Sequence, residues 1–381
     1  MMRSFAPASI ALAAPLLLAC GSGAYSPAGA GPDGSAAPGA DAGGFEPVVP
    51  FDGGPTDIPI TVAPTTIAGM PAGFRLAVQV VLGDAGPLQA FLDTGSIGIQ
   101  ALESALPADA LAAIELGSTP IRSVFESGVT ASGVIGKAVV TLGDRTTPGP
   151  IPIVVYQSFT CQPGSGCAQG DAGPPPSGDL FGGYPVIVGA GLRNGSASSA
   201  PGLGSPIPQL PGQPSFIVKA PSFGGTAGTL RLGPSADEVR AFSTIQLARF
   251  APGAPLANGT PAWDDTGIPA CVDDQASASN YCASAVLDTG SPLTAVFVTG
   301  HFGQEVLPPG DDVTVSIGPT SAPVEQFDVT VGATPQLGLD VFVIVPPVVG
   351  APGSINLGLT VFFRYDVYFD PVHGTVGLLP H

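Results

Sequence analysis

Residues 89–100, QAFLDTGSIGIQ, place Asp93 at the end of an apolar run and directly before a Thr-Gly pair. Nearly the same words return at residues 284–297, SAVLDTGSPLTAVF, with Asp288 in the matching place. The two aspartates are 195 residues apart (288 − 93). A pentapeptide that recurs at such a distance indicates two similar halves, each of which contributes one carboxylate to a shared site.

Two carboxylates brought together can hydrolyse an amide bond without a metal or a covalent intermediate. Like charges a few ångströms apart cannot both ionise cheaply, so the pair holds one proton between its members. The ionised member takes a proton from a trapped water, while the protonated member hydrogen-bonds the scissile carbonyl. The sequence therefore predicts that Asp93 and Asp288 are a catalytic pair.

The residues after each aspartate suit a tight loop at the end of a strand. A glycine lets a backbone N–H approach the carboxylate. A threonine hydroxyl could join the two loops, and a serine hydroxyl can hydrogen-bond the outer carboxylate oxygen. These residues are Thr94 and Thr289, Gly95 and Gly290, and Ser96 and Ser291. A single DTG in a Gly-rich chain is most often an ordinary turn, but two identical LDTGS copies after apolar strands favour a site.

The strand period dominates the chain around both copies. Residues 75–93, RLAVQVVLGDAGPLQAFLD, predict a hairpin that ends in the first loop. Further strands or hairpins are expected at 132–144, 214–234, 326–331 and 362–380. A helix is expected only at 101–116, and Pro107 interrupts that segment. The fold class is mostly β.

Each half also contains a later apolar stretch that ends in glycine. These are PVIVGAGL at 185–192, with Gly189, and SINLGLTVFF at 354–363, with Gly358. The repeat predicts an N-terminal lobe over 55–205 and a C-terminal lobe over 206–381, with a Pro- and Gly-rich seam at 202–214.

The first 54 residues lack the strand pattern and the repeat of the later chain. Residues 1–20 carry one Arg, an apolar run and a small residue before Cys20, which is typical of a lipoprotein signal peptide that is lipidated at Cys20; a plain signal peptide is the alternative. Residues 21–54 are rich in Gly, Pro and Ala and are expected to be a flexible tether. An inhibitory pro-segment is the other interpretation, but no Lys or Arg lies between Arg3 and Arg75 to neutralise an acidic site.

Composition excludes several classes of function. The net charge of −18 and 11 basic residues disfavour nucleic-acid binding. The three histidines are scattered and no CxxC pair occurs, so neither a metal site nor a cofactor is expected. Besides Cys20, an even number of cysteines in an exported chain favours two disulfides, and the local pairs Cys161–Cys167 and Cys271–Cys282 are the simplest of three connectivities.

From about Pro55 to its end, the chain resembles a bilobal, pepsin-like aspartic peptidase in a divergent bacterial form. The order is a hairpin into the first DTGS, a flap hairpin, a glycine-ended apolar element, a seam, and then a second DTG and element. Residues 354–380 are similar to the closing segment of the family, and Cys282 lies near a family disulfide. The resemblance implies two barrel-like lobes of six strands with a cleft between them, catalytic Asp93 and Asp288, interlocking Thr94 and Thr289, and supporting Ser96 and Ser291.

Three features depart from that pattern. Gln100 stands where the family has an aromatic residue bonded to a flap tyrosine, and Phe125 and Glu126 stand where that tyrosine is expected. Phe125 either covers substrate or is a packed strand residue. Asp93 and Gly189 are 96 residues apart (189 − 93), whereas Asp288 and Gly358 are only 70 apart (358 − 288), which shortens the second lobe.

The sequence thus predicts a monomeric, exported, lipid-anchored aspartic endopeptidase at the outer membrane, in the periplasm or at the cell surface. Its substrate would be an extended peptide or unfolded protein bound as a strand. The alternative is a catalytically inactive lipoprotein that binds peptides or other ligands on the same scaffold. A surface adhesin or stalk protein would account for the tether but not for the repeated LDTGS.

Overall fold

The computed structural model describes residues 54–65, 73–125, 129–161, 181–196, 200–212, 214–221, 225–301, 303, 305–333, 340–347 and 352–381. The predicted signal peptide, Cys20 and nearly all of the predicted tether lie outside these residues, as do Glu126, Cys167 and the side chain of Cys161. Among the described residues, no helix is long and apolar enough to cross a membrane.

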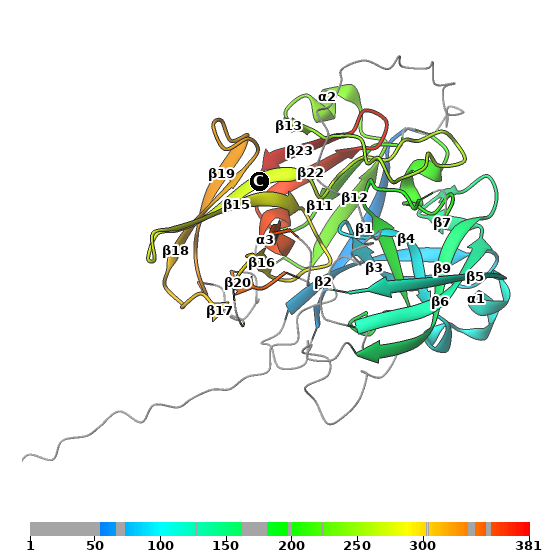
Figure 1. Ribbon diagram of the computed structural model, residues 1–381. Coiled ribbons are helices and arrows are strands. Elements are labelled where there is room, and N and C mark those ends of the chain that lie inside the picture. Colours follow the sequence, from blue (N-terminus) through cyan, green and yellow to red (C-terminus); the bar gives the residue numbers. More distant parts are fainter. Residues whose placement is uncertain are drawn as a thin grey trace, which may run out of the picture.

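The described chain is mostly β, as predicted, and has two sheets (Figure 1). The first contains 15 strands within the described residues. They are β1 (Thr56–Thr65), β2 (Gly73–Leu82), β3 (Leu88–Asp93), β4 (Ile97–Leu102), β5 (Glu115–Val124), β6 (Val129–Ala138), β7 (Val140–Leu142), β8 (Arg145–Thr146), β9 (Ile151–Cys161), β10 (Val186–Ala190), β11 (Phe216–Lys219), β12 (Ala227–Leu232), β13 (Ser243–Gln246), β22 (Tyr365–Asp370) and β23 (Thr375–Pro380).

The second sheet contains eight strands and belongs wholly to the second half of the chain. They are β14 (Ile268–Asp274), β15 (Ser279–Val286), β16 (Thr294–Phe297), β17 (Glu305–Val306), β18 (Asp312–Ile317), β19 (Glu325–Thr330), β20 (Phe342–Val345) and β21 (Ser354–Asn356). The two sheets therefore differ in size, with 15 strands in the first and eight in the second among the described residues.

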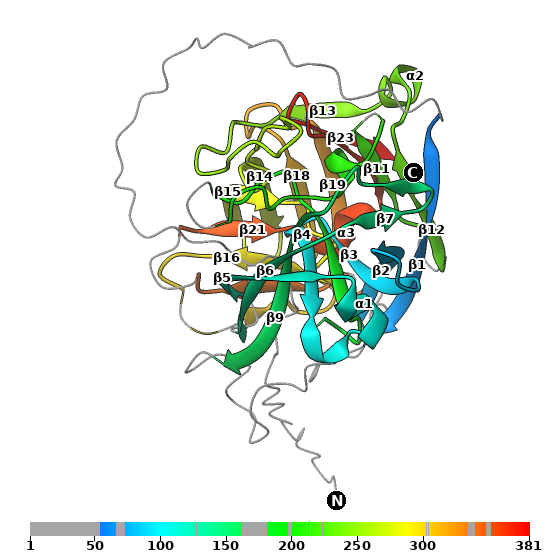
Figure 2. The ribbon, with the colours of Figure 1, turned by 90° about the vertical axis from the view of Figure 1, so that its right-hand side faces the viewer.

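The larger sheet contains strands from both halves of the chain. β11, β12, β13, β22 and β23 all follow residue 205, yet they continue the sheet formed by the first half. The link is β12, which pairs with β1 from Thr56↔Leu232 to Thr61↔Ala227; Figure 2 shows β1 and β12 side by side. One continuous layer of hydrogen bonds thus contains strands from both sides of residue 205.

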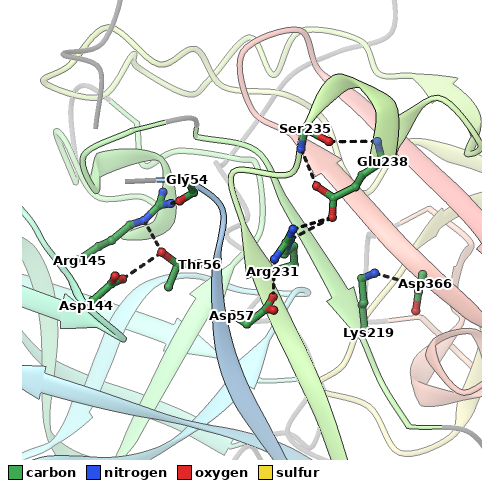
Figure 3. A network of polar contacts seen from close by, with 10 residues as sticks. All are labelled: Gly54, Thr56, Asp57, Asp144, Arg145, Lys219, Arg231, Ser235, Glu238 and Asp366. Carbon is green, nitrogen blue, oxygen red and sulfur yellow. Dashed lines mark hydrogen bonds and ion pairs between the residues drawn. The ribbon is translucent and has the colours of Figure 1, made fainter. Parts of the chain in front are cut away.

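Polar contacts hold β1 in this junction (Figure 3). Arg231 on β12 lies between two carboxylates, 3.1 Å from Asp57 Oδ1 and 2.9 Å from Glu238 Oε1. Arg145 donates to the Thr56 hydroxyl at 3.1 Å. The ion pairs of Arg231 are partly exposed and therefore individually weak.

The predicted hairpins are confirmed. β2 pairs with β3, β11 with β12, and β22 with β23, all antiparallel. The predicted helix at 101–116 is wrong as one element: Pro107 separates the 3₁₀ turn Glu103–Ala105 from α1 (Ala108–Ala112). A proline has no N–H and clashes with the preceding turn, so it begins a helix here instead of continuing one. The other described helices are the 3₁₀ turn Ile207–Gln209, α2 (Ala236–Val239) and α3 (Gly358–Phe362).

One main apolar core connects the two halves. It includes Leu92 and Val188 beside the first loop and Ile355 and Leu357 beside the second, all at most 1% exposed. A disulfide joins Cys271 to Cys282, which are directly opposite on β14 and β15, so this predicted pair is confirmed; the 161–167 pair lies outside the described side chains.

Candidate active site

Each repeated aspartate lies at the carboxyl end of a strand that has a parallel neighbour. β3 ends at Asp93, and β10 runs beside it with Gly189 in register with Asp93. In the second half β15 ends two residues before Asp288, and β21 runs beside it with Asn356 in register with Val286. β10 and β21, which come from the two glycine-ended apolar segments of the sequence repeat, therefore run beside the strands that lead into the two DTG loops.

The threonines interlock the two loops. The N–H of Thr94 donates to Thr289 Oγ1 and the N–H of Thr289 donates to Thr94 Oγ1, both at 3.0 Å. Each hydroxyl then donates across to a carbonyl of the other half, Thr94 to Leu287 and Thr289 to Leu92, both at 2.7 Å. All these groups are buried, so the reciprocal bonds rigidly fix the distance between the loops.

The glycines allow the two carboxylates to approach each other. A Cβ placed on Gly290 would lie 2.6 Å from Oδ1 of Asp93 and 2.6 Å from Oδ1 of Asp288. A Cβ on Gly95 would collide with the Asp288 carboxyl, 2.7 Å from Oδ2 and closer to its other atoms. The Oδ1 atoms of Asp93 and Asp288 thus face the same point between the loops, and no side chain fits there.

The surroundings of Asp93 favour its protonated form. The N–H of Gly95 donates to Asp93 Oδ1 at 2.9 Å, and the N–H of Gly290 donates to Asp288 Oδ1 at 2.6 Å. Asp93 and Asp288 are 2% and 0% exposed. Burial first, and then the charge of Asp288 and a hydrogen bond with it, raise the pKa of Asp93 well above its ordinary value.

The predicted serine contacts differ between the loops. The Ser96 hydroxyl is buried without a well-formed hydrogen bond, yet it lies near enough to Asp93 to lower its pKa slightly against the larger effects. Ser291 Oγ donates to the carbonyl of Leu293 at 2.8 Å instead of to a carboxylate. The outer oxygen of Asp288 accepts a 2.7 Å bond from Asn356 Nδ2, a residue that the sequence repeat did not single out.

Two arginines hold the carbonyls of the loop glycines. Arg75 Nη1 on β2 donates to the carbonyl of Gly290 at 2.9 Å, and Arg193 Nη2 donates to that of Gly95 at 2.6 Å. Arg193 also forms a buried ion pair with Asp265, Nε to Oδ1, at 2.6 Å. Burial raises the pKa of Asp265, although Arg193 and the N–H of Leu192 act in the opposite direction.

A cavity of about 480 Å³ opens beside the aspartates, between the two sheets. Ser96 and Asn356, which adjoin the two carboxylates, both line it. Ile121 and Ser123 of the β5–β6 hairpin form another part of its wall. The hairpin predicted to be the flap therefore borders the cavity.

A tyrosine outside that hairpin connects it to β4, the strand that follows the first loop. Tyr156 on β9 donates to Ser123 Oγ at 2.6 Å and lies 3.1 Å from Gln100 Oε1. Gln100 occupies the place where the family resemblance implies an aromatic residue. Phe125 does not cover the cavity: it is 3% exposed and its ring packs against Tyr156 and Phe181. Of its two interpretations, the packed strand residue is the one that the structure favours.

The described residues contain no group of three or more His, Cys, Asp or Glu side chains placed to hold a metal ion. The site offers two buried carboxylates beside a cavity of about 480 Å³.

No family model and no curated protein matches this sequence. Among solved structures, the fold is similar to the aspartic proteinase from Irpex lacteus, with a TM-score of 0.53 and 16% sequence identity. The similarity covers 86% of this chain and 97% of that chain. At this identity the comparison shows the fold alone, and it defines the class: a bilobal, pepsin-like acid-protease fold.

Sequence reasoning missed several contributors to the site, among them Arg75, Tyr156 and Asn356. Each of these three is a polar residue inside an otherwise apolar segment, RLAVQVVL, PIVVYQ and SINLGL. A polar side chain in a buried strand must have a hydrogen-bonding partner. That signal could have marked all three residues as candidates, although not their partners.

Proposed function

We propose that this protein is an aspartic endopeptidase, a divergent bacterial form, that hydrolyses peptide bonds with a water activated by Asp93 and Asp288. The observation that carries the proposal is the contact between two buried carboxylates from the two halves of the chain, with the pKa of Asp93 raised by burial and by Asp288. A pair in this state can supply a base and an acid at once.

The ionised carboxylate would take a proton from the water, which attacks the scissile carbonyl. The protonated carboxyl would hydrogen-bond the carbonyl oxygen and stabilise its developing negative charge. The proton taken from the water then passes to the leaving nitrogen, and the C–N bond breaks. The pair again holds a single proton. Because one proton must remain on the pair, activity should be greatest in acid.

The substrate would be an extended peptide or an unfolded protein. The cavity lies between two sheets and has the edge of a hairpin above it, which suits a chain bound as an added strand. Export and anchoring through lipidated Cys20 belong to the same proposal and are supported by the N-terminal sequence.

A non-enzymatic binding protein on this scaffold is the second candidate. The observation in its favour is the altered flap, in which Phe125 is part of the core and Gln100 replaces an aromatic residue. Both aspartates are nevertheless retained and in contact.

A peptide inhibitor with a hydroxyl that mimics the tetrahedral intermediate separates the two candidates. At 100 times its Kd such a ligand stabilises the folded state by about 2.7 kcal/mol. The proposal expects this thermal protection in acid and its loss in Asp93→Asn and Asp288→Asn. Absence of protection of the unmodified chain at every pH from 3 to 6 would favour the binding protein.

A further inference from the structure

The two carboxylates have the same loop sequence but different hydrogen-bond donors. Asp288 accepts from a backbone N–H on Oδ1 and from Asn356 Nδ2 on Oδ2. Asp93 accepts from the N–H of Gly95 on Oδ1, and its nearest hydroxyl, Ser96 Oγ, has no well-formed bond. Donors to both oxygens stabilise the charged form of a carboxyl group.

The orientation of the Asn356 amide is fixed by two partners. Its Oδ1 accepts the N–H of Gly358 at 3.1 Å, so its Nδ2 must point to Asp288. The side chain is 1% exposed, and water does not compete for these bonds. An amide held in this way is a permanent donor, because its N–H groups do not titrate in the range of carboxylates.

Other charges near the site do not distinguish the two aspartates in the same way. Arg75 holds the carbonyl of Gly290 and Arg193 holds that of Gly95, so each loop has one guanidinium. Asp265 faces Arg193 and balances part of its charge. The position that matches Asn356 in the first half, two residues before the glycine, is the apolar Ile187.

We infer that Asn356 is a positioning residue that makes Asp288 the ionised member of the pair and leaves the shared proton on Asp93. On this assignment Asp288 is the base toward the water and Asp93 is the acid toward the carbonyl. The raised pKa of Asp93 agrees with this distribution. The inference deepens the proposed function and depends on it only for these two catalytic roles.

The test uses the pH dependence of unfolding, which needs no catalysis. Asn356→Leu removes the donor to Asp288, and its bond to a charged carboxylate is about twice as strong as one to a neutral carboxyl. Asn356→Leu should therefore lower the urea midpoint about twice as much at pH 6 as at pH 3. The same substitution in the Asp288→Asn background gives the loss expected for a neutral acceptor. A loss in the unmodified background that is the same at every pH and no larger than this reference would mean that Asp288 carries no charge or that Asn356 is merely structural, and would overturn the inference.

Ser291→Ala is the matched comparison, because this hydroxyl is also close to Asp288 in the sequence but bonds Leu293. Its effect on the midpoint should not change with pH. If Asn356→Leu does not fold, Asn356→Asp replaces it: the introduced carboxyl can still accept from Gly358 and, when protonated, donate to Asp288. That variant should be close to wild type at pH 3 and lose stability as pH rises, and a loss that does not depend on pH would contradict the inference.

The activity profile provides the second readout. In Asn356→Leu the acidic limb of kcat/KM should move up by about one pH unit, while Ser291→Ala leaves it in place. If neither wild type nor any variant cleaves a peptide but the stability result holds, the proposed function fails and the assignment of the ionised carboxylate stands. If wild type cleaves and the limb does not move, the inference about Asn356 fails alone.

Discussion

The loops at Asp93 and Asp288 have the same five-residue sequence but different hydrogen-bond environments. Their threonine bonds are almost identical, at 3.0 and 2.7 Å in both directions. Their outer contacts differ, because Asn356 bonds Asp288 whereas the matching Ile187 is packed in the core. The repeat thus builds a symmetrical frame, and residues outside it divide the chemical roles.

The largest effect should come from adding a methyl group between the two loops. Gly290→Ala would force a Cβ against both inner oxygens, and Gly95→Ala would force one against Asp288. We expect each variant to lose about 3 kcal/mol of stability, as in an overpacked core, and at least about a hundredfold in kcat/KM, since a displaced catalytic group reacts poorly.

Gly149→Ala is the control, because nothing lies within 4 Å of the place that its added methyl group would occupy. Its free energy of unfolding should change by no more than about 0.5 kcal/mol. Full peptidase activity in Gly290→Ala would show that the carboxylates do not need to be this close.

The next effect concerns the arginine that holds the first loop. Arg193→Met leaves Asp265 buried without its cation, which should cost about 3 kcal/mol. In the double variant with Asp265→Asn the loss should be smaller than the sum of the single losses, because the two residues are coupled. Additive losses in urea unfolding would contradict the pairing. Arg240→Met, in the exposed pair with Asp237, is the control and should have little effect.

A smaller effect is expected at the link between β4 and the hairpin. Tyr156→Phe removes bonds to Ser123 and Gln100, which should cost about 1–2 kcal/mol. The hairpin would then be less well fixed over the cavity, so KM should rise several-fold more than kcat falls. Tyr281→Phe on β15 is the control, since Tyr281 is not among the described residues that line the cavity. Equal behaviour of the two variants would remove Tyr156 from the site.

The smallest effect is a slope in the pH dependence of stability. The pKa of Asp93 is raised in the folded state, so its contribution to stability is fully present below its unfolded pKa of about 4 and is lost as pH rises through the folded value. The slope is at most about 1.4 kcal/mol per pH unit for one proton. Asp93→Asn should remove it, and chemical unfolding across pH 4 to 7 measures the difference. An unchanged slope would place the shared proton elsewhere.

Much of this molecule could be predicted from local pattern. The two LDTGS motifs located both loops. The hairpins at 75–93 and 362–380 were predicted from strand alternation and turn residues. Cys271 and Cys282 are close in sequence, and they are bonded. These features depend on neighbours in the chain, which a sequence displays directly.

What could not be predicted depends on contacts between distant residues. Asn356 reaches Asp288 across 68 positions, and Arg75 reaches Gly290 across 215. The pairing of β1 with β12 could not be predicted for the same reason, since it joins residues about 170 positions apart.

The most direct measurement is the cleavage of an unfolded protein by wild type, Asp93→Asn and Asp288→Asn in parallel between pH 3 and 7, with products identified by mass spectrometry. General acid–base groups each contribute about 10²–10⁴-fold, so we predict internal cleavage by wild type in acid and a loss of at least that size in both variants. Undiminished turnover by either folded variant would contradict a two-aspartate mechanism.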